Sequence, residues 1–220
     1  IMPEGKYVSH YATCEISGYG EVKNGKIVGT RIEYYRNGKT KWKSITSSDT
    51  TLVMKFYESG MHSDSLLYIN DKENGQCKTW YENGNLKECS FFNNGTPDST
   101  CIIYHENGKI DKLANYKNGV LNGLSLSYFE NGKIETEIYL VNGKPEGLAK
   151  GYHENGQLAN KLNFSNGVYD GECWTYHPNG KLKMLAKVEM GTPVSYKEYD
   201  DVGKLIEELK DGTKIDHRKK

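Results

Sequence analysis

The chain has 220 residues and a formal net charge of zero, with 24 Gly and 17 Tyr but only 5 Phe. Its negative mean hydropathy excludes a large aliphatic core, and its many regularly placed aromatic residues exclude a disordered chain. The zero net charge disfavours a nucleic-acid-binding surface, and no apolar stretch reaches the length of a membrane helix.

Two turn signals alternate along the chain from about residue 16 to about residue 205. The first centres on a Gly that recurs in steps of 22, then five steps of 24, then 23, at Gly38, Gly60, Gly84, Gly108, Gly132, Gly156, Gly180 and Gly203. The second lies midway between successive copies of the first, as at Asn118-Gly119, Asn142-Gly143 and Asn166-Gly167. A fixed period of this kind indicates a repeat array.

Each repeat is predicted to be one β-hairpin, because Asn-Gly between short aromatic or aliphatic runs favours tight reversal of the chain. The expected fold is all-β: an elongated antiparallel meander of repeated β-hairpins, about 24 residues per repeat. We expect one repeat domain, 1–220, with repeats over about 16–205 and a basic tail, 212–220, that is interpreted as a solvated end. The repeat at 40–60 is two residues short, which predicts a kink or a distorted hairpin.

The Glu-Asn-Gly-Lys turn is predicted to be a tight two-residue loop, and the second Asn-Gly turn to be longer and less regular. That register places His153 opposite Leu158 on one face of the sheet, which we call the small-residue face because it also carries Ser90 and Ala114. The other face, called the tyrosine face, carries Trp80, Tyr104, Tyr128, Tyr152 and Tyr176. Bulky charged residues such as Lys87 and Glu135 are expected on the tyrosine face as well.

No residue pattern for catalysis or for a cofactor is present, so the chain is expected not to be an enzyme and to need no cofactor. His105, His153 and His177 share one repeat position, but residues in successive hairpins stand roughly 10 Å apart, too far to share a metal ion. We interpret these rings as half-buried covers over neighbouring aliphatic residues, and we predict no metal site.

The five cysteines show no pairing pattern. Cys77, Cys101 and Cys173 share a position that holds Ser125 and Ala149 in other copies, so that position requires a small residue. Cys89 falls on the opposite face by parity, and Cys14 lies far away in the sequence. Five unpaired thiols favour a reducing compartment, hence the cytoplasm over the periplasm. The sequence leaves open whether a leader or lipid anchor precedes Ile1.

The repeats resemble MORN-type repeats, in the bacterial variant with a Tyr-x-x-Asn-Gly-Lys-Leu core. The motif is carried by Tyr104–Ile110, Tyr128–Ile134, Tyr152–Leu158 and Tyr176–Leu182, and more weakly by Trp80–Leu86. The chain looks like a member of the YwqK-like antitoxin family, whose members are taken to be immunity proteins against secreted toxins. This resemblance implies a bacterial protein that neutralises a cognate protein toxin by steric occlusion. The alternative is a MORN-type scaffold or membrane-surface module, and a homo-oligomer stays open.

Residues that break the repeat pattern are the candidates for partner contact. Trp174 stands where other copies have Lys78, Ile102 or Leu126, and exposed aromatic and aliphatic residues of this kind form interface hot spots. The alternative for each is packing against a neighbouring hairpin or a second copy. We expect the tyrosine face, centred on 102–176, to carry the partner through Trp174, Leu126, Leu124, Tyr128, Tyr139, Ile102, Tyr104, Leu113, Tyr152 and Tyr176, with Trp42 as a further candidate.

Overall fold

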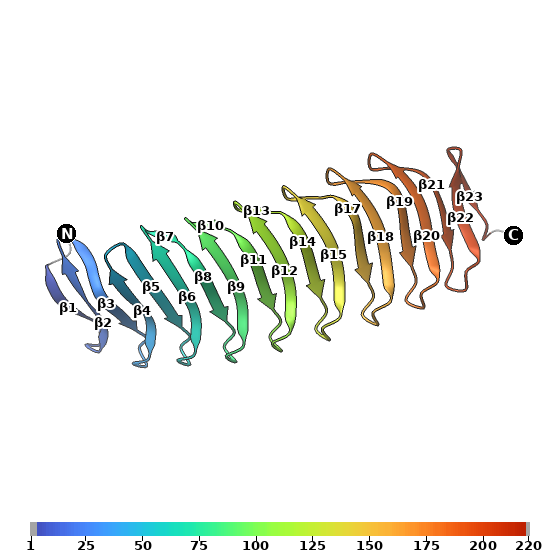
Figure 1. The fold of residues 1–220 in the computed structure, drawn as a ribbon. Helices are drawn as coiled ribbons and strands as arrows, with labels where there is room; N and C mark the ends of the chain where they lie inside the picture. The colour runs from blue at the N-terminus through green and yellow to red at the C-terminus, as the bar shows by residue number, and fades with distance from the viewer. Residues whose placement is uncertain (1–3, 219–220) are drawn as a thin grey trace. The chain divides into compact units, whose positions relative to one another are not determined.

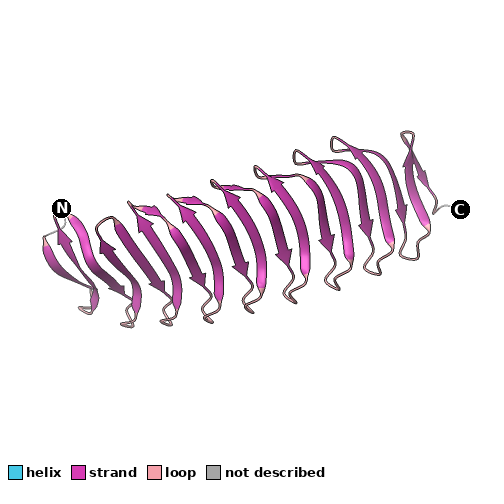
Figure 2. Cartoon of the chain, viewed as in Figure 1, coloured by secondary structure: helices cyan, strands magenta, loops and turns pink. Residues whose placement is uncertain are grey.

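The computed structural model of the chain describes residues 4–218, and within that range it contains strands, turns and loops but no helix (Figure 2). The predicted fold class is confirmed: the protein is all-β and built from antiparallel hairpins that follow one another in chain order. Among the described residues, no segment forms a helix of the length and apolarity that a membrane crossing requires. The chain divides into two compact units, residues 1–108 and 109–220, and each is described by itself. The prediction of one repeat domain stays a prediction.

Unit 1 is an antiparallel meander in which each strand pairs with the next (Figure 1). Two of its later strands are interrupted by bulges, so the short pieces β7 and β10 carry their own labels. Its strands are β1 (Gly5–His10), β2 (Ile16–Lys23), β3 (Lys26–Tyr34), β4 (Thr40–Ser47), β5 (Thr50–Phe56), β6 (His62–Ile69), β7 (Lys72–Glu73), β8 (Gly75–Trp80), β9 (Leu86–Asn93), β10 (Thr96–Pro97) and β11 (Ser99–Tyr104).

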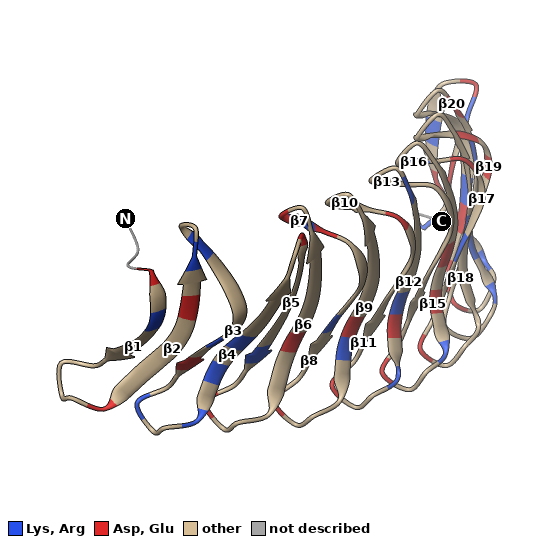
Figure 3. Cartoon of the chain, turned by 60° about the vertical axis from the view of Figure 1, so that its left-hand side comes forward, with Lys and Arg blue, Asp and Glu red and all other residues tan. Residues whose placement is uncertain are grey.

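Unit 2 repeats the same meander, and its strands lie side by side in chain order (Figure 1). Charged residues of both signs are distributed over the strands, without a long run of one sign (Figure 3). Its strands are β12 (Ile110–Lys117), β13 (Val120–Leu121), β14 (Gly123–Tyr128), β15 (Ile134–Val141), β16 (Lys144–Pro145), β17 (Gly147–Tyr152), β18 (Leu158–Ser165), β19 (Val168–Tyr176), β20 (Leu182–Glu189), β21 (Thr192–Tyr199), β22 (Leu205–Lys210) and β23 (Thr213–Asp216).

The loop lengths of the two turn types are the reverse of the prediction, because the second Asn-Gly turn is the shorter one. Lys117 pairs with Val120 across Asn118-Gly119, and both turn residues have positive φ, 51° and 81°. This is a two-residue type I′ turn, whose twist matches that of the flanking strands.

The Glu-Asn-Gly-Lys turn is the longer one. The Phe129 amide donates to the Lys133 carbonyl at 2.9 Å, and the Gly132 amide donates to the Phe129 carbonyl at 2.7 Å. Three residues therefore form the loop, and of these only Gly132 has positive φ, 88°.

A bulge beside each three-residue loop changes the face assignment. Ser127 pairs with Thr136 while Tyr128 pairs with Ile134, so Glu135 is an extra residue on β15. Because paired residues share a face, Ile134 lies with Tyr128 on the tyrosine face. The predicted placement of this aliphatic position on the small-residue face is wrong.

The bulged residue itself points to the small-residue face, and its predicted place on the tyrosine face is also wrong. The Glu135 carboxylate accepts a 2.9 Å hydrogen bond from the Ser127 hydroxyl. In unit 1 the equivalent Lys87 ammonium lies 5.7 Å from the centre of the Tyr81 ring.

The predicted kink at 40–60 is wrong as well. Trp42 pairs with Lys55, and the register continues unbroken to Ser47 and Thr50 beside the turn. In a regular repeat Tyr116 faces Leu121 and Leu113 faces Leu126, so the second strand carries two extra residues in a bulge. The short repeat lacks those two residues because its hairpin has no bulge there.

The three-residue loops are joined by a ladder of side-chain hydrogen bonds to the next repeat, 20 to 23 residues on. Tyr81 donates to the Tyr104 carbonyl at 2.7 Å, and a ring nitrogen of His153 lies 3.0 Å from the Tyr176 carbonyl. The loop Asn and Lys do the same: Asn131 donates to the Glu154 carbonyl at 3.1 Å, and Lys133 to the Asn155 carbonyl at 2.7 Å. The motif recurs because each copy satisfies backbone carbonyls of the next copy.

Few side chains are deeply buried, as expected for a thin sheet held by contacts between neighbouring repeats. Small side chains dominate because they fit between adjacent strands. The buried hydrophobic residues are Val22, Cys77, Leu140, Ala149, Cys173, Ala186 and Val188.

The described part of the basic tail is not simply a solvated end. β23 pairs with β22, and the Arg218 guanidinium contacts Asp216 at 3.0 Å and Glu207 at 3.1 Å. Lys219 and Lys220, which belong to the same predicted tail, lie outside the described residues.

Candidate functional site

The two faces of unit 2 differ in how they are filled. The small-residue face carries a cluster of Cys173, Ala186 and Val188, against which Met184 and Tyr196 pack. Most of the exposed large apolar side chains on the strands of this unit lie on the other, tyrosine face.

An exposed apolar patch lies on the tyrosine face of unit 2, on the side of the two-residue turns. Leu124 and Tyr139 pair directly across β14 and β15 and are 39% and 49% exposed. Leu148 is 44% exposed and stands two residues before Lys150, on the same face. By the same parity the patch is completed by Val120, Val141 and Val168.

A row of cross-strand pairs crosses the middle of the tyrosine face. Leu126 pairs with Glu137, and Glu137 pairs with Lys150 on β17. The Lys150 ammonium lies 3.1 Å from the Glu137 carboxylate, and this hydrogen bond raises the pKa of Lys150. The Tyr152 hydroxyl also contacts this carboxylate, at 3.4 Å.

The row continues toward the last strands of the unit. Lys161 pairs with Trp174, Trp174 with Leu185, and Leu185 with Lys197. Trp174 and Leu185 are half-buried, and neither Lys161 nor Lys197 has an ion-pair partner among residues 4–218. Two lysines therefore flank an aromatic and aliphatic pair, an arrangement suited to the polar rim of an interface.

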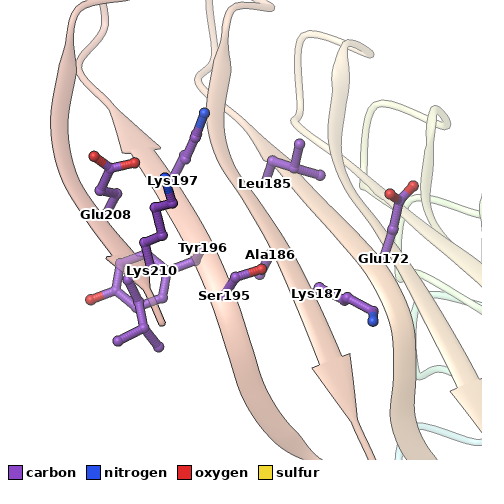
Figure 4. Close-up of a pocket in the computed structure, with 10 residues that line it drawn as sticks. Glu172, Leu185, Ala186, Lys187, Ser195, Tyr196, Lys197, Glu208 and Lys210 are labelled. Atoms are coloured by element: carbon purple, nitrogen blue, oxygen red, sulfur yellow. The ribbon is translucent and has the colours of Figure 1, made fainter. Parts of the chain in front are cut away.

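A shallow hollow of about 430 Å³ opens beside this pair, over β19 to β22 (Figure 4). Its lining includes Leu185, Lys187, Ser195, Lys197 and Glu208. The Lys187 ammonium is held by Glu189 at 2.8 Å, which raises the pKa of Lys187. The hollow mixes cationic and anionic groups, so it favours hydrogen bonds with a polypeptide over a purely anionic ligand.

The structure brings together most of the predicted contact residues of unit 2. Leu113, Leu124, Leu126, Tyr139 and Trp174 all lie on its tyrosine face, where Leu113 pairs with Leu126. The same face carries Tyr128, Tyr152 and Tyr176, each paired with the aliphatic residue that follows its loop. Of the predicted set in this unit, Leu124 and Tyr139 are the exposed ones. Their role in binding stays a prediction.

Three predicted residues belong to unit 1. Ile102 and Tyr104 are half-buried on its tyrosine face, where Ile102 pairs with Cys89. Trp42 pairs with Glu33 and Lys55 on the small-residue face. Its indole N–H donates to the Glu33 carboxylate at 2.9 Å, and Arg31 lies 4.6 Å over its ring.

Sequence reasoning missed Leu148 and Leu185. Leu148 occupies the position of Gln76, Thr100, Leu124 and Glu172 in other copies, so its aliphatic side chain was a pattern break that could have identified it. Leu185 did not stand out, because another copy also has a leucine, Leu113, at the same repeat position.

Among residues 4–218, no group of three or more His, Cys, Asp or Glu side chains is arranged to hold a metal ion. The repeated histidines are half-buried, as predicted, and two of them make a contact that the sequence did not suggest. The ring nitrogens of His153 and His177 lie 3.0 and 2.9 Å from backbone carbonyls of the next hairpin.

A series of antiparallel β-hairpins that recur about every 24 residues, each in contact with the next, defines a β-hairpin repeat protein. Comparison with protein families assigns it more closely. Five consecutive segments match the family described as the MORN repeat variant, at residues 73–94, 97–118, 121–142, 145–166 and 169–187. The chain is a MORN repeat variant protein. Comparison with curated proteins finds no match.

Proposed function

We propose that this chain is a protein-binding scaffold that neutralises a cognate bacterial toxin by covering it. The single observation that carries a binding role is the exposed apolar patch around Leu124, Tyr139 and Leu148. Apolar side chains gathered on one face, beside lysines without ion-pair partners in the described chain, are typical of protein interfaces.

A toxin is proposed as the partner because the repeats resemble those of the YwqK-like antitoxin family, in which the same motif residues shape the turns. Those residues build the hairpin ladder and supply no reacting group, so inhibition is by occlusion of the toxin surface. Toxin neutralisation is expected to take place in the bacterial cytoplasm, where the five free thiols stay reduced.

The proposal is tested with the reading frame adjacent to the gene. That frame is expressed in a host with and without this chain, and growth and complex formation are measured. Growth arrest that this chain relieves, together with a co-purifying complex, supports the antitoxin role. Equal growth in both hosts and no complex would contradict it.

The competing function is a MORN-type scaffold at a membrane surface. It is favoured by the family itself and requires a basic face that attracts anionic lipid. Sedimentation of the chain with vesicles of phosphatidylserine and phosphatidylcholine discriminates the two. Binding that disappears without phosphatidylserine favours the membrane module.

A further inference from the structure

The short repeat of unit 1 departs from the other copies at adjacent positions. The loop motif ends in Lys133-Ile134, Gln157-Leu158 or Lys181-Leu182 elsewhere, but in Met61-His62 here. Lys133 donates to the Asn155 carbonyl of the next loop at 2.7 Å, a bond that a methionine thioether cannot donate. The copy that contains Met61 therefore lacks this hydrogen bond between loops. Its sequence instead places the Met61 thioether next to the His62 imidazole.

Met61 and His62 lie close to other residues that are unusual for their repeat positions. Met54, Met61, His62 and Trp80 line one hollow of about 350 Å³ in unit 1. Trp80 stands where most copies have tyrosine, as at Tyr104 and Tyr128. The His62 and Trp80 rings are 5.8 Å apart between centres.

His62 is the ring in this hollow that is free to bind. Its Phe56 and Trp80 neighbours are aromatic contacts, and neither ring nitrogen has a hydrogen-bond partner among residues 4–218. By contrast, His153 and His177 both bond to backbone carbonyls. His62 is exposed, and an imidazole without a hydrogen bond keeps its lone pair for a ligand.

We propose that Met54, Met61, His62 and Trp80 form a binding site for a soft monovalent cation, Cu⁺ or Ag⁺. Thioether sulfur is a soft donor that selects Cu⁺, and imidazole nitrogen also suits copper. The Trp80 ring offers its electron-rich face to a cation within about 6 Å. Oxygen-preferring ions such as Mg²⁺ find no carboxylate in the lining of this hollow.

The side chains can adjust to close around an ion. Met61 is 46% exposed, and its terminal methyl group lies over Gly84, where a Cβ would approach it to 3.1 Å. Methionine has three rotatable bonds and changes rotamer easily, so its sulfur can turn toward the imidazole. Gly84 leaves room for that side chain. The site is independent of the toxin-binding proposal, because it lies on unit 1 and needs no protein partner.

Thiols also bind these ions, so the test uses the full chain with each cysteine replaced by Ser or Ala. Cys77, Cys101 and Cys173 occupy the position of Ser125 and Ala149, so this background is expected to fold. The chain is labelled with ¹³C in the methionine methyl groups and titrated with silver nitrate. One equivalent is expected to shift the Met54 and Met61 signals and leave Met184 and Met190 unmoved.

The matched variant is Met61→Lys with His62→Leu, which restores the sequence of the regular repeats and should melt no earlier than its parent. It is expected to lose at least tenfold in affinity for Ag⁺, and for Cu⁺ in anaerobic competition with bicinchoninate. Met190→Leu, 77% exposed at a distant turn, serves as the control and should bind like the parent. Unshifted Met54 and Met61 signals, or equal affinity in the restored variant, would overturn the site.

Discussion

The phenolic hydroxyl of Tyr57 donates a 2.6 Å hydrogen bond to the carbonyl oxygen of Trp80, 23 residues further along the chain. Tyr35 and Tyr81 make the same contact one repeat earlier and one repeat later, at 2.8 and 2.7 Å. Each bond connects one hairpin to the next, so the loop edge of the sheet is held by side chains as well as by strand pairing.

Removing one of these hydroxyl groups should therefore lower stability. Tyr57→Phe is expected to cost about 0.5–1.5 kcal/mol in the free energy of unfolding, measured by urea denaturation, because the Trp80 carbonyl loses a donor. Tyr139→Phe is the control, since Tyr139 is exposed and its hydroxyl donates no hydrogen bond within residues 4–218. Equal midpoints for the two variants would show that the ladder adds nothing.

The opposite change can be made at Phe129. This residue occupies the repeat position of Tyr57 and Tyr81 but has no hydroxyl group. Phe129→Tyr should place a hydroxyl near the Tyr152 carbonyl, by analogy with Tyr81. The expected gain is about 0.5–1 kcal/mol in the same urea measurement. A loss of stability would mean that the loop at Phe129 differs from its neighbours.

The period and the Asn-Gly turns were sufficient to predict an all-β array of hairpins. They were not sufficient for the loop lengths, since Asn-Gly occurs in both turn types. Asn118 adopts positive φ while Asn131 does not, because the Asn131 side chain instead caps the Lys133 amide within its loop at 2.9 Å. The resulting bulge moved Ile134 to the other face, which parity alone does not reveal.

The candidate surface was predictable where an unusual residue lay on a regularly paired part of its strand, away from the bulge, as for Leu124 and Tyr139. The ladder was not predictable, because it joins residues 20 to 23 positions apart whose distance depends on the stacking of loops. Trp42 shows the limit of pattern breaking as a guide. It is an unusual residue, yet its side chain is held by Glu33 and Arg31 of its own sheet.

The Cys101 thiol should resist modification. Burial, together with the Glu88 carboxylate 3.7 Å from its sulfur, raises the pKa of Cys101 to about 11. Because the thiolate is the nucleophile, alkylation by iodoacetamide at pH 8.5 should be much slower at Cys101 than at the exposed Cys14. Peptide mass spectrometry over time measures both rates.

The raised pKa of Cys101 also fixes the sign of a pH effect. The folded chain holds the Cys101 proton more tightly than the unfolded chain, so this stabilisation is complete below pH 9 and is lost as pH rises toward 11. Glu88→Gln should reduce this alkaline loss and speed alkylation. Rates at Cys101 and Cys14 that match in the parent chain would contradict the raised pKa of Cys101.

The last strand should loosen in acid. Hydrogen bonds from the Tyr196 hydroxyl at 2.6 Å and the Lys214 ammonium at 2.9 Å lower the pKa of the buried Glu207. A lowered carboxyl pKa contributes stability above the unfolded value, and that stability is lost as pH falls through the folded value. NMR amide shifts of Lys214 and Ile215 should move between pH 5 and pH 2 in the parent chain. Glu207→Gln should remove that transition, and its persistence would point to another group.

We propose that the tyrosine face of unit 2 carries the partner. It is tested most directly by calorimetric titration of the partner from the adjacent reading frame into single variants of this chain. Tyr139→Ala, Leu126→Ala and Trp174→Ala remove side chains from the tyrosine face. Tyr169→Ala is the matched control, because Tyr169 is 44% exposed and pairs with Phe164 on the small-residue face.

Each variant is first melted, so that a loss of folding is separated from a loss of binding. The tyrosine-face variants are expected to keep their melting temperature and to bind about 1–3 kcal/mol more weakly, while Tyr169→Ala should bind like the parent chain. Normal binding by all three tyrosine-face variants, or a loss confined to Tyr169→Ala, would contradict it.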